Sequence, residues 1–164
     1  MDQLDLTAEQ LLTTTRAVRK RLDLMRPVPR ELIVECARIA MQAPAASNNS
    51  TLQFLVVTDP DKRRAIGEVY AKAWSIYSTL DGVYIGSIDK PTDELRAQQA
   101  RSTGSAAYLA EHLAEVPAIV IGCHVGGRLE GLPGAPLAAM TGNVLPAMWS
   151  FMLAARLHGL GTCW

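Results

Sequence analysis

The chain has 164 residues, of which 49% are apolar, and this is enough to bury the core of one domain. Its 16 basic and 16 acidic residues cancel, so the net charge gives no reason to expect a nucleic acid partner. Three cysteines at wide spacing form neither a CxxC pair nor a disulfide framework, which favours a reducing, cytoplasmic setting.

The first elements are short helices separated by prolines. Thr7 and Gln10 form a capping box, which predicts a helix running toward Val18. Pro29 suits the first position of a second helix, whose apolar residues recur at helical spacing. This helix is expected to end near Pro44, because a residue before proline disfavours the helical conformation.

Strands and helices alternate after this point. Residues 53–58 predict a buried strand, and Asp59-Pro60 predicts the start of a helix. A further helix is expected over 92–114, and a second buried strand over 118–125. Residues 126–142 are rich in glycine and predict a loop.

The last helix, over 143–158, is apolar around most of its circumference. It is expected to be buried on several sides and to end at Gly159. It is too interrupted for a membrane span, and the acidic start of the chain is unlike a secretory leader. Residues 159–164 resemble the beginning of another buried strand. The order of elements predicts a single α/β (α+β) domain over residues 1–164, with a mixed central sheet flanked by helices in three layers.

The first candidate site is the basic segment Thr15-Arg16-Ala17-Val18-Arg19. On a continuing helix, Arg16 and Arg19 share one face, and two guanidinium groups there suit phosphate oxygens. The same spacing also fits a solvated basic face, which the neighbouring Lys20 and Arg21 favour. The residues alone leave both interpretations open.

The second candidate site is the segment Ala43-Pro44-Ala45-Ala46-Ser47-Asn48. Small residues after a proline let the backbone approach a flat ligand closely, and Asn48 offers two donors and an acceptor to the edge of a heterocycle. An ordinary loop with asparagine in a turn explains the same pattern.

The remaining reactive side chains give no site. His112, His124 and His158 lack metal-ligand spacing, and each is expected at the surface or at a helix end. Cys36 lies on the apolar face of its helix and is expected in the core. The sequence contains no GxGxxG and no GxxxxGK[ST] phosphate loop.

Taken in order, these pieces resemble the FMN-dependent nitroreductase family across nearly the whole chain. The similar family stretches are an R-R-S-x-R opening, a D-x-x-R-P-V-P-x-E segment, an A-P-S-x-x-N loop and an F-V-V-V-x-D-P strand. In this sequence they correspond to residues 15–19, 23–29 with the following helix, 42–48 and 54–60, and residues 112–117 and 153–164 are also similar. No single motif is highly specific, but the ordered set is, and it favours a ligand site over both alternatives.

The resemblance implies a dimeric nitroreductase-like fold with one FMN at each subunit interface. It implies that Arg16 and Arg19, with Ala17 between them, hold the FMN phosphate. It also implies that the partner subunit lines the flavin ring with Pro44, Ala45, Ala46, Ser47 and Asn48. The activity implied is transfer of a hydride from NAD(P)H through the flavin to a nitroaromatic, a quinone or a similar small molecule. No general acid is assigned, and neither a membrane nor a nucleic acid is expected as partner.

The sequence departs from the family pattern in three places. Ala17 replaces the usual serine, which removes a hydroxyl donor to the phosphate. Ser50-Thr51-Leu52 stands where the family has Q-P-W. Family members continue well past Trp164, so the domain is expected to be incomplete at its C-terminus. These departures leave open a second interpretation, in which the protein binds or sequesters flavin without turnover.

Overall fold

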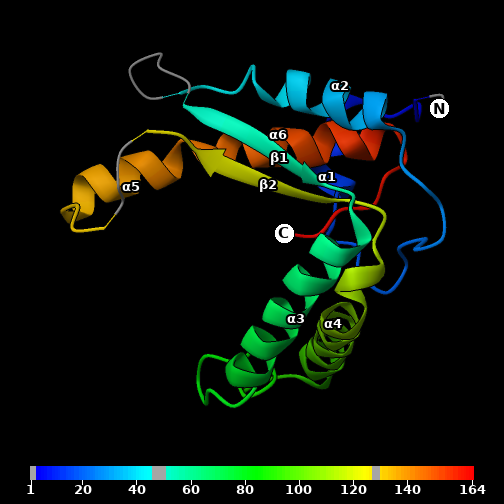
Figure 1. The fold of residues 1–164 in the computed structure, drawn as a ribbon. Helices are drawn as coiled ribbons and strands as arrows, with labels where there is room; N and C mark the ends of the chain where they lie inside the picture. The colour runs from blue at the N-terminus through cyan, green and yellow to red at the C-terminus, as the bar shows by residue number, and fades with distance from the viewer. Residues whose placement is uncertain (1–2, 46–50, 127–129) are drawn as a thin grey trace. The chain divides into compact units, whose positions relative to one another are not determined.

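A computed structural model describes residues 3–45, 51–126 and 130–164. Helices and a two-stranded sheet make up the described chain, which is therefore α+β (Figure 1). The residues group into two compact units. The first unit comprises Met1–Ala17, Val28–Val56 and Val120–Trp164, and the second comprises Val18–Pro27 and Val57–Ile119.

Helix ends in the first unit follow the signals in the sequence. Helix α1 (Ala8–Thr14) begins with the predicted capping box, in which Gln10 N donates to Thr7 Oγ1 at 3.1 Å and Thr7 N donates to Gln10 Oε1 at 2.9 Å. Helix α6 (Val144–Leu157) ends as predicted at Gly159, whose φ of 73° lies in the left-handed region that favours glycine. Leu160 N then donates to Ala155 O at 2.9 Å, which closes a Schellman motif.

The core of the first unit lies between α6 and helix α2 (Arg30–Ala40). Cys36, Ala40 and Ala155 are fully buried, and their small side chains let the two helices approach closely. Phe151 extends the core to the sheet, where its ring lies 5.6 Å from that of Phe54, measured between centroids. The buried residues of the two helices are Leu32, Ile33, Cys36, Ala40, Ala147, Phe151, Met152, Ala154 and Ala155.

The sheet pairs β1 (Leu52–Val57) with β2 (Ile119–His124), within one residue of the predicted bounds. The two strands are antiparallel, and Val125 N donates to Thr51 O at 2.7 Å where β1 begins and β2 ends. A mixed sheet needs at least three strands, so the mixed sheet expected from the sequence does not occur within the described residues. The strands are also less buried than expected, because the Leu55 side chain remains 53% exposed.

The sequence predicts a loop over residues 126–142, but part of this region is helical. Helix α5 (Gly134–Gly142) forms there, because the run of alanine, leucine and methionine between its terminal glycines favours a helix. Asn143 is both the C-cap of α5 and the N-cap of α6. The combined run Gly134–Leu157 has 24 residues and is long and apolar enough to cross a membrane, by length and composition only. Five residues of α6 are buried, whereas no residue of α5 is buried.

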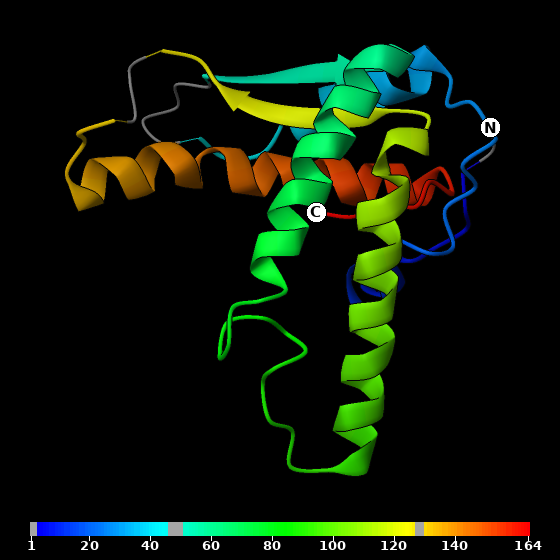
Figure 2. The same cartoon turned by 60° about the horizontal axis from the view of Figure 1, so that its bottom comes forward.

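The second unit is built on two long helices, α3 (Pro60–Tyr77) and α4 (Asp93–His112), which lie side by side (Figure 2). The 3-10 helix η2 (Leu113–Glu115) follows α4 and packs against α3. Gly67 of α3 permits this packing, because a Cβ at this position would lie 3.1 Å from both the Cβ and the backbone nitrogen of Ala114.

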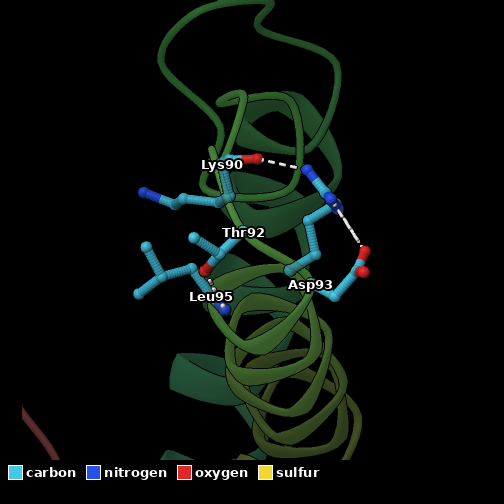
Figure 3. Close-up of polar contacts among 5 residues, drawn as sticks. Lys90, Thr92, Asp93 and Leu95 are labelled. Carbon is cyan, nitrogen blue, oxygen red and sulfur yellow. Dashed lines mark hydrogen bonds and ion pairs between the residues drawn. The ribbon is translucent and has the colours of Figure 1, made fainter.

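The N-terminus of α4 is fixed by polar contacts (Figure 3). Thr92 Oγ1 accepts a hydrogen bond from Leu95 N at 3.3 Å and caps the helix. Arg96 donates to Asp93 Oδ1 at 2.7 Å and to the carbonyl oxygen of Lys90. These contacts join the first turn of α4 to the chain that precedes it.

Candidate functional site

The basic segment does not continue helix α1, which ends at Thr14. Thr15 caps the helix with an extended backbone (φ −66°, ψ 128°), and residues 16–18 have no helical structure. The prediction that Arg16 and Arg19 share a helix face is therefore wrong. The two arginines also belong to different units, Arg16 to the first and Arg19 to the second.

Three successive threonines explain why the helix stops. The hydroxyls of Thr13, Thr14 and Thr15 each donate to the carbonyl oxygen four residues earlier, at 2.6 to 2.7 Å. Such back-bonding, together with β-branching, weakens a helix. Thr15 is buried, with 5% of its surface exposed, and so anchors the start of the basic segment to the first unit.

The donors of this segment suit an anion. Arg16 is exposed, and its Nη1 donates to Thr15 O at 2.8 Å, which leaves other guanidinium donors for a ligand. Within the described chain, the backbone N–H groups of Arg16 and Ala17 meet no acceptor. Ala17 contributes no side-chain donor. Charged and backbone donors side by side are a set that binds phosphate oxygens.

The second candidate segment follows helix α2. Pro44 is exposed and Ala45 is half-buried. Ala46, Ser47 and Asn48 lie outside the described residues, so the predictions for them stay predictions.

The ends of α1 and α2, which lead to Arg16 and to Pro44, lie apart within the first unit. Figures 1 and 2 show α1 beside the C-terminal end of α6, away from the end of α2 and the start of β1. Leu4 N, close before α1, donates to Leu157 O at 2.6 Å, which fixes this arrangement. Strand β1 alone spans about 20 Å for its six residues.

His124 makes a polar contact that the sequence analysis did not predict. Its Nδ1 lies 2.7 Å from Thr51 Oγ1, and its Nε2 lies 2.8 Å from Gly126 O. Thr51 immediately precedes β1, and His124 is the last residue of β2. Antiparallel pairing brings the two residues together, because it places the start of β1 opposite the end of β2.

The surroundings of His112, His158 and Cys36 give no sign of a ligand site. His112 Nδ1 lies 2.7 Å from Glu115 Oε1, and its ring lies 4.1 Å from that of Tyr108. His158 lies at a helix end, as expected, but is buried, and in the described part of the chain its ring nitrogens have no hydrogen-bond partner. Burial, with a smaller effect of the nearby Glu35 charge, raises the pKa of the Cys36 thiol to about 11. Among the described residues, no cluster of ligand side chains could hold a metal ion.

A shallow cavity of about 330 Å³ lies in the second unit between α3, α4 and η2. Its wall is mostly apolar, and its lining includes Trp74, Arg64, Glu68 and Glu111. Nothing in the described residues marks it as a binding site.

Comparison with known proteins decides the family. A model of the nitroreductase family matches residues 12–164, which include both candidate segments. The chain belongs to the nitroreductase family. Membership makes it an oxidoreductase in the general sense and confirms the predicted nitroreductase-like α+β fold. No curated protein matches the chain.

Solved nitroreductase structures share this fold. A nitroreductase-like family protein from Bacillus cereus is 17% identical, with a TM-score of 0.59 over 98% of this chain and 70% of that one. The FMN-dependent nitroreductase NfnB from Mycobacterium smegmatis, in complex with NADPH, is 21% identical, with a TM-score of 0.58 over 95% and 72% of the two chains. A mutant of the FMN and NADPH-dependent nitroreductase NfnB from Sphigopyxis sp. strain HMH is 25% identical, with a TM-score of 0.56 over 96% and 73%.

Proposed function

We propose that this nitroreductase-family chain is an FMN-dependent oxidoreductase that transfers a hydride from NAD(P)H to a nitroaromatic, a quinone or a similar acceptor. The family match over residues 12–164 is the observation that carries the proposal, because it spans both candidate segments. It also spans both units, which supports treating residues 1–164 as one domain. The related structures that bind FMN and NADPH support the choice of cofactors.

The residues of this chain fit the phosphate end of FMN. Arg16 and the backbone donors of Arg16 and Ala17 form an exposed set of donors after a buried anchor, Thr15. A phosphate-binding role for Arg19, which belongs to the second unit, stays a prediction from the family resemblance. When bound, FMN supplies the hydride chemistry, and the protein binds, orients and shields it.

The ring end of the site is proposed to come from a second copy. Arg16 follows the end of α1 and Pro44 follows the end of α2, and these two helix ends lie apart in the first unit (Figures 1 and 2), which supports a site shared between two subunits. Ala46, Ser47 and Asn48 complete this part of the proposal. The exposed apolar surface of the last helices supports a homodimer, because Leu145 is 45% exposed, Trp149 is 38% exposed and no residue of α5 is buried.

We also propose that the protein is cytoplasmic. Cys36 is buried and Cys123 is half-buried, and neither forms a disulfide within the described residues, which is compatible with a reducing compartment.

Release and identification of the cofactor test the proposal. We expect purified protein to be yellow and to release FMN on heating, in a ratio of one per chain. Sedimentation equilibrium of the same sample is expected to give a dimer. Recovery of FAD, or failure of the apoprotein to take up added FMN, would contradict the proposed cofactor, and a stable monomer that binds FMN would contradict the shared site.

A second candidate function is flavin binding without turnover. The absence of a hydroxyl at Ala17 favours it, because the phosphate then lacks one side-chain donor. Bound FMN that NADPH does not reduce would support this second function.

A further inference from the structure

Thr15 links the end of helix α1 to the exposed Arg16 through all of its polar groups. Its N–H and its hydroxyl both donate to Leu11 O, at 3.3 Å and 2.6 Å. Its carbonyl oxygen accepts a hydrogen bond from Arg16 Nη1 at 2.8 Å. Because Thr15 is also buried, it forms a fixed, fully hydrogen-bonded connection between the helix and the arginine.

The bond to Thr15 determines which guanidinium donors of Arg16 remain for a ligand. It uses Nη1, whereas Nε and Nη2 carry the two parallel N–H groups that bind two oxygens of one phosphate. Within the residues that the structure describes, Nε and Nη2 meet no acceptor. The guanidinium group is therefore held on one side, while its bidentate edge stays open to an anion.

Thr15 also fixes the backbone that carries the next donor. Its carbonyl group shares one planar peptide unit with the N–H of Arg16, which meets no acceptor within the described chain. The extended conformation of Thr15 (φ −66°, ψ 128°) sets the direction of this peptide plane. The hydroxyl bond to Leu11 O and the β-branched, buried side chain hold Thr15 in that conformation.

We propose that Thr15 is a positioning residue for the FMN phosphate, acting through Arg16. By fixing its own carbonyl group, Thr15 holds the open guanidinium edge and the backbone N–H of Arg16 in one arrangement before the cofactor binds. This inference rests on the proposed function, in which Arg16 binds the phosphate. Thr15 itself need not touch the cofactor.

Conservative variants of Thr15 test this role. Thr15→Val keeps the β-branched shape and removes the hydroxyl, whereas Thr15→Ser keeps the hydroxyl. We expect Thr15→Val to bind FMN about three- to tenfold more weakly in a fluorescence titration, as for one lost neutral hydrogen bond. Thr15→Ser is expected to bind FMN within about twofold of the wild type, because its hydroxyl donates to the same carbonyl oxygen.

Riboflavin separates positioning of the phosphate site from general stability. It has the same ring system as FMN but lacks the phosphate, so it does not use the donors of Arg16. Thr15→Val and the wild type are therefore expected to bind riboflavin equally well. A general loss of stability would weaken the binding of both flavins alike.

Thr14 provides the matched control. Its hydroxyl donates to Gln10 O at 2.6 Å in the same way, but its side chain is exposed. Thr14→Val removes an equivalent hydrogen bond, and its FMN affinity is expected to equal that of the wild type. In the background of Arg16→Ala, Thr15→Val is expected to weaken FMN binding no further, because Thr15 acts through that arginine.

Four results would overturn the inference while leaving the proposed function intact. These are wild-type FMN affinity in Thr15→Val, an equal loss of FMN affinity in Thr14→Val, an equal loss of riboflavin affinity in Thr15→Val, and simple additivity with Arg16→Ala. A Thr15→Ser variant as weak as Thr15→Val would also contradict it. A wild-type protein that takes up no FMN would instead contradict the proposed function and, with it, this role for Thr15.

Discussion

Replacing Arg63 by alanine removes a side chain that donates hydrogen bonds to three backbone carbonyl oxygens of the second unit. Arg63 lies in the first turn of α3, where its Nε donates to Thr58 O at 3.2 Å. Its Nη1 donates to Ala114 O at 3.2 Å and also to Val116 O. One guanidinium group therefore joins the start of α3 to the chain around η2, beside the buried Val116.

The expected cost of Arg63→Ala follows from these contacts. A hydrogen bond from a charged group contributes about 1.5–3 kcal/mol, and the two part-buried carbonyls lose their donor together. The bonds share one side chain and are not additive, so we expect a loss of about 2–3 kcal/mol in the free energy of unfolding. This corresponds to a fall of roughly 4–12 °C in Tm for a chain of this size. Arg63→Lys keeps the charge but loses the planar, multidentate guanidinium donors, so we expect an intermediate loss in the free energy of unfolding.

Arg64 provides the matched control. Its ion pair with Asp61 measures 2.9 Å, but the two side chains are 62% and 83% exposed, so Arg64→Ala should cost less than about 1 kcal/mol. Urea unfolding followed by tryptophan fluorescence measures both, and replacing Trp149 and Trp164 by phenylalanine leaves Trp74 to report on the second unit. Equal losses for the two arginine variants, or full stability in Arg63→Lys, would refute the reasoning.

Further predictions concern packing, titration and ligand binding. Gly122→Ala should lower the free energy of unfolding, measured with urea, by about 1–3 kcal/mol, because a Cβ there would lie 2.9 Å from the stiff Val144 side chain. Unchanged stability would contradict the close contact of β2 and α6. The folded-state pKa of Cys36, about 11, exceeds the ordinary 9.0, so its contribution to stability is complete below pH 9 and is lost as the pH rises toward 11. Unfolding midpoints should therefore fall more steeply over this range in the wild type than in Cys36→Ala, and parallel curves would disprove the assignment. Arg16→Ala should weaken FMN binding by about 10- to 100-fold in a fluorescence titration, whereas Arg21→Ala should change it little; equal effects would mean a merely solvated basic segment.

Local signals in the sequence predicted most of the element boundaries. The capping box at Thr7, the Asp59-Pro60 start and the glycine at 159 each act within a few residues, so they could be read without tertiary information. Helix α5 was not predicted, because its glycines were counted as loop residues. They lie at its two ends, where glycine disturbs a helix less than in its interior. The exposure of Leu55 could not be predicted, since alternation and apolar runs do not tell which sheet face is covered.

The candidate site was harder to predict than the fold. The shared helix face of Arg16 and Arg19 failed because Thr13 to Thr15 end α1 through back-bonding, which competes with helix propagation in a way that spacing does not reveal. The hydrogen bond between Thr51 and His124 depends on strand pairing between residues 73 positions apart, which neither residue alone reveals. The identity of the family, in contrast, was contained in the ordered set of short motifs.

Anaerobic reduction of the FMN-loaded protein tests the central claim most directly. NADPH or NADH is added to the protein without oxygen while the flavin absorption is recorded, and a nitroaromatic or a quinone is added afterwards. The account predicts that the flavin band bleaches with one equivalent of reduced nicotinamide and returns when the acceptor is added. Bound FMN that neither nicotinamide reduces, or reduced flavin that neither acceptor reoxidises, would contradict it.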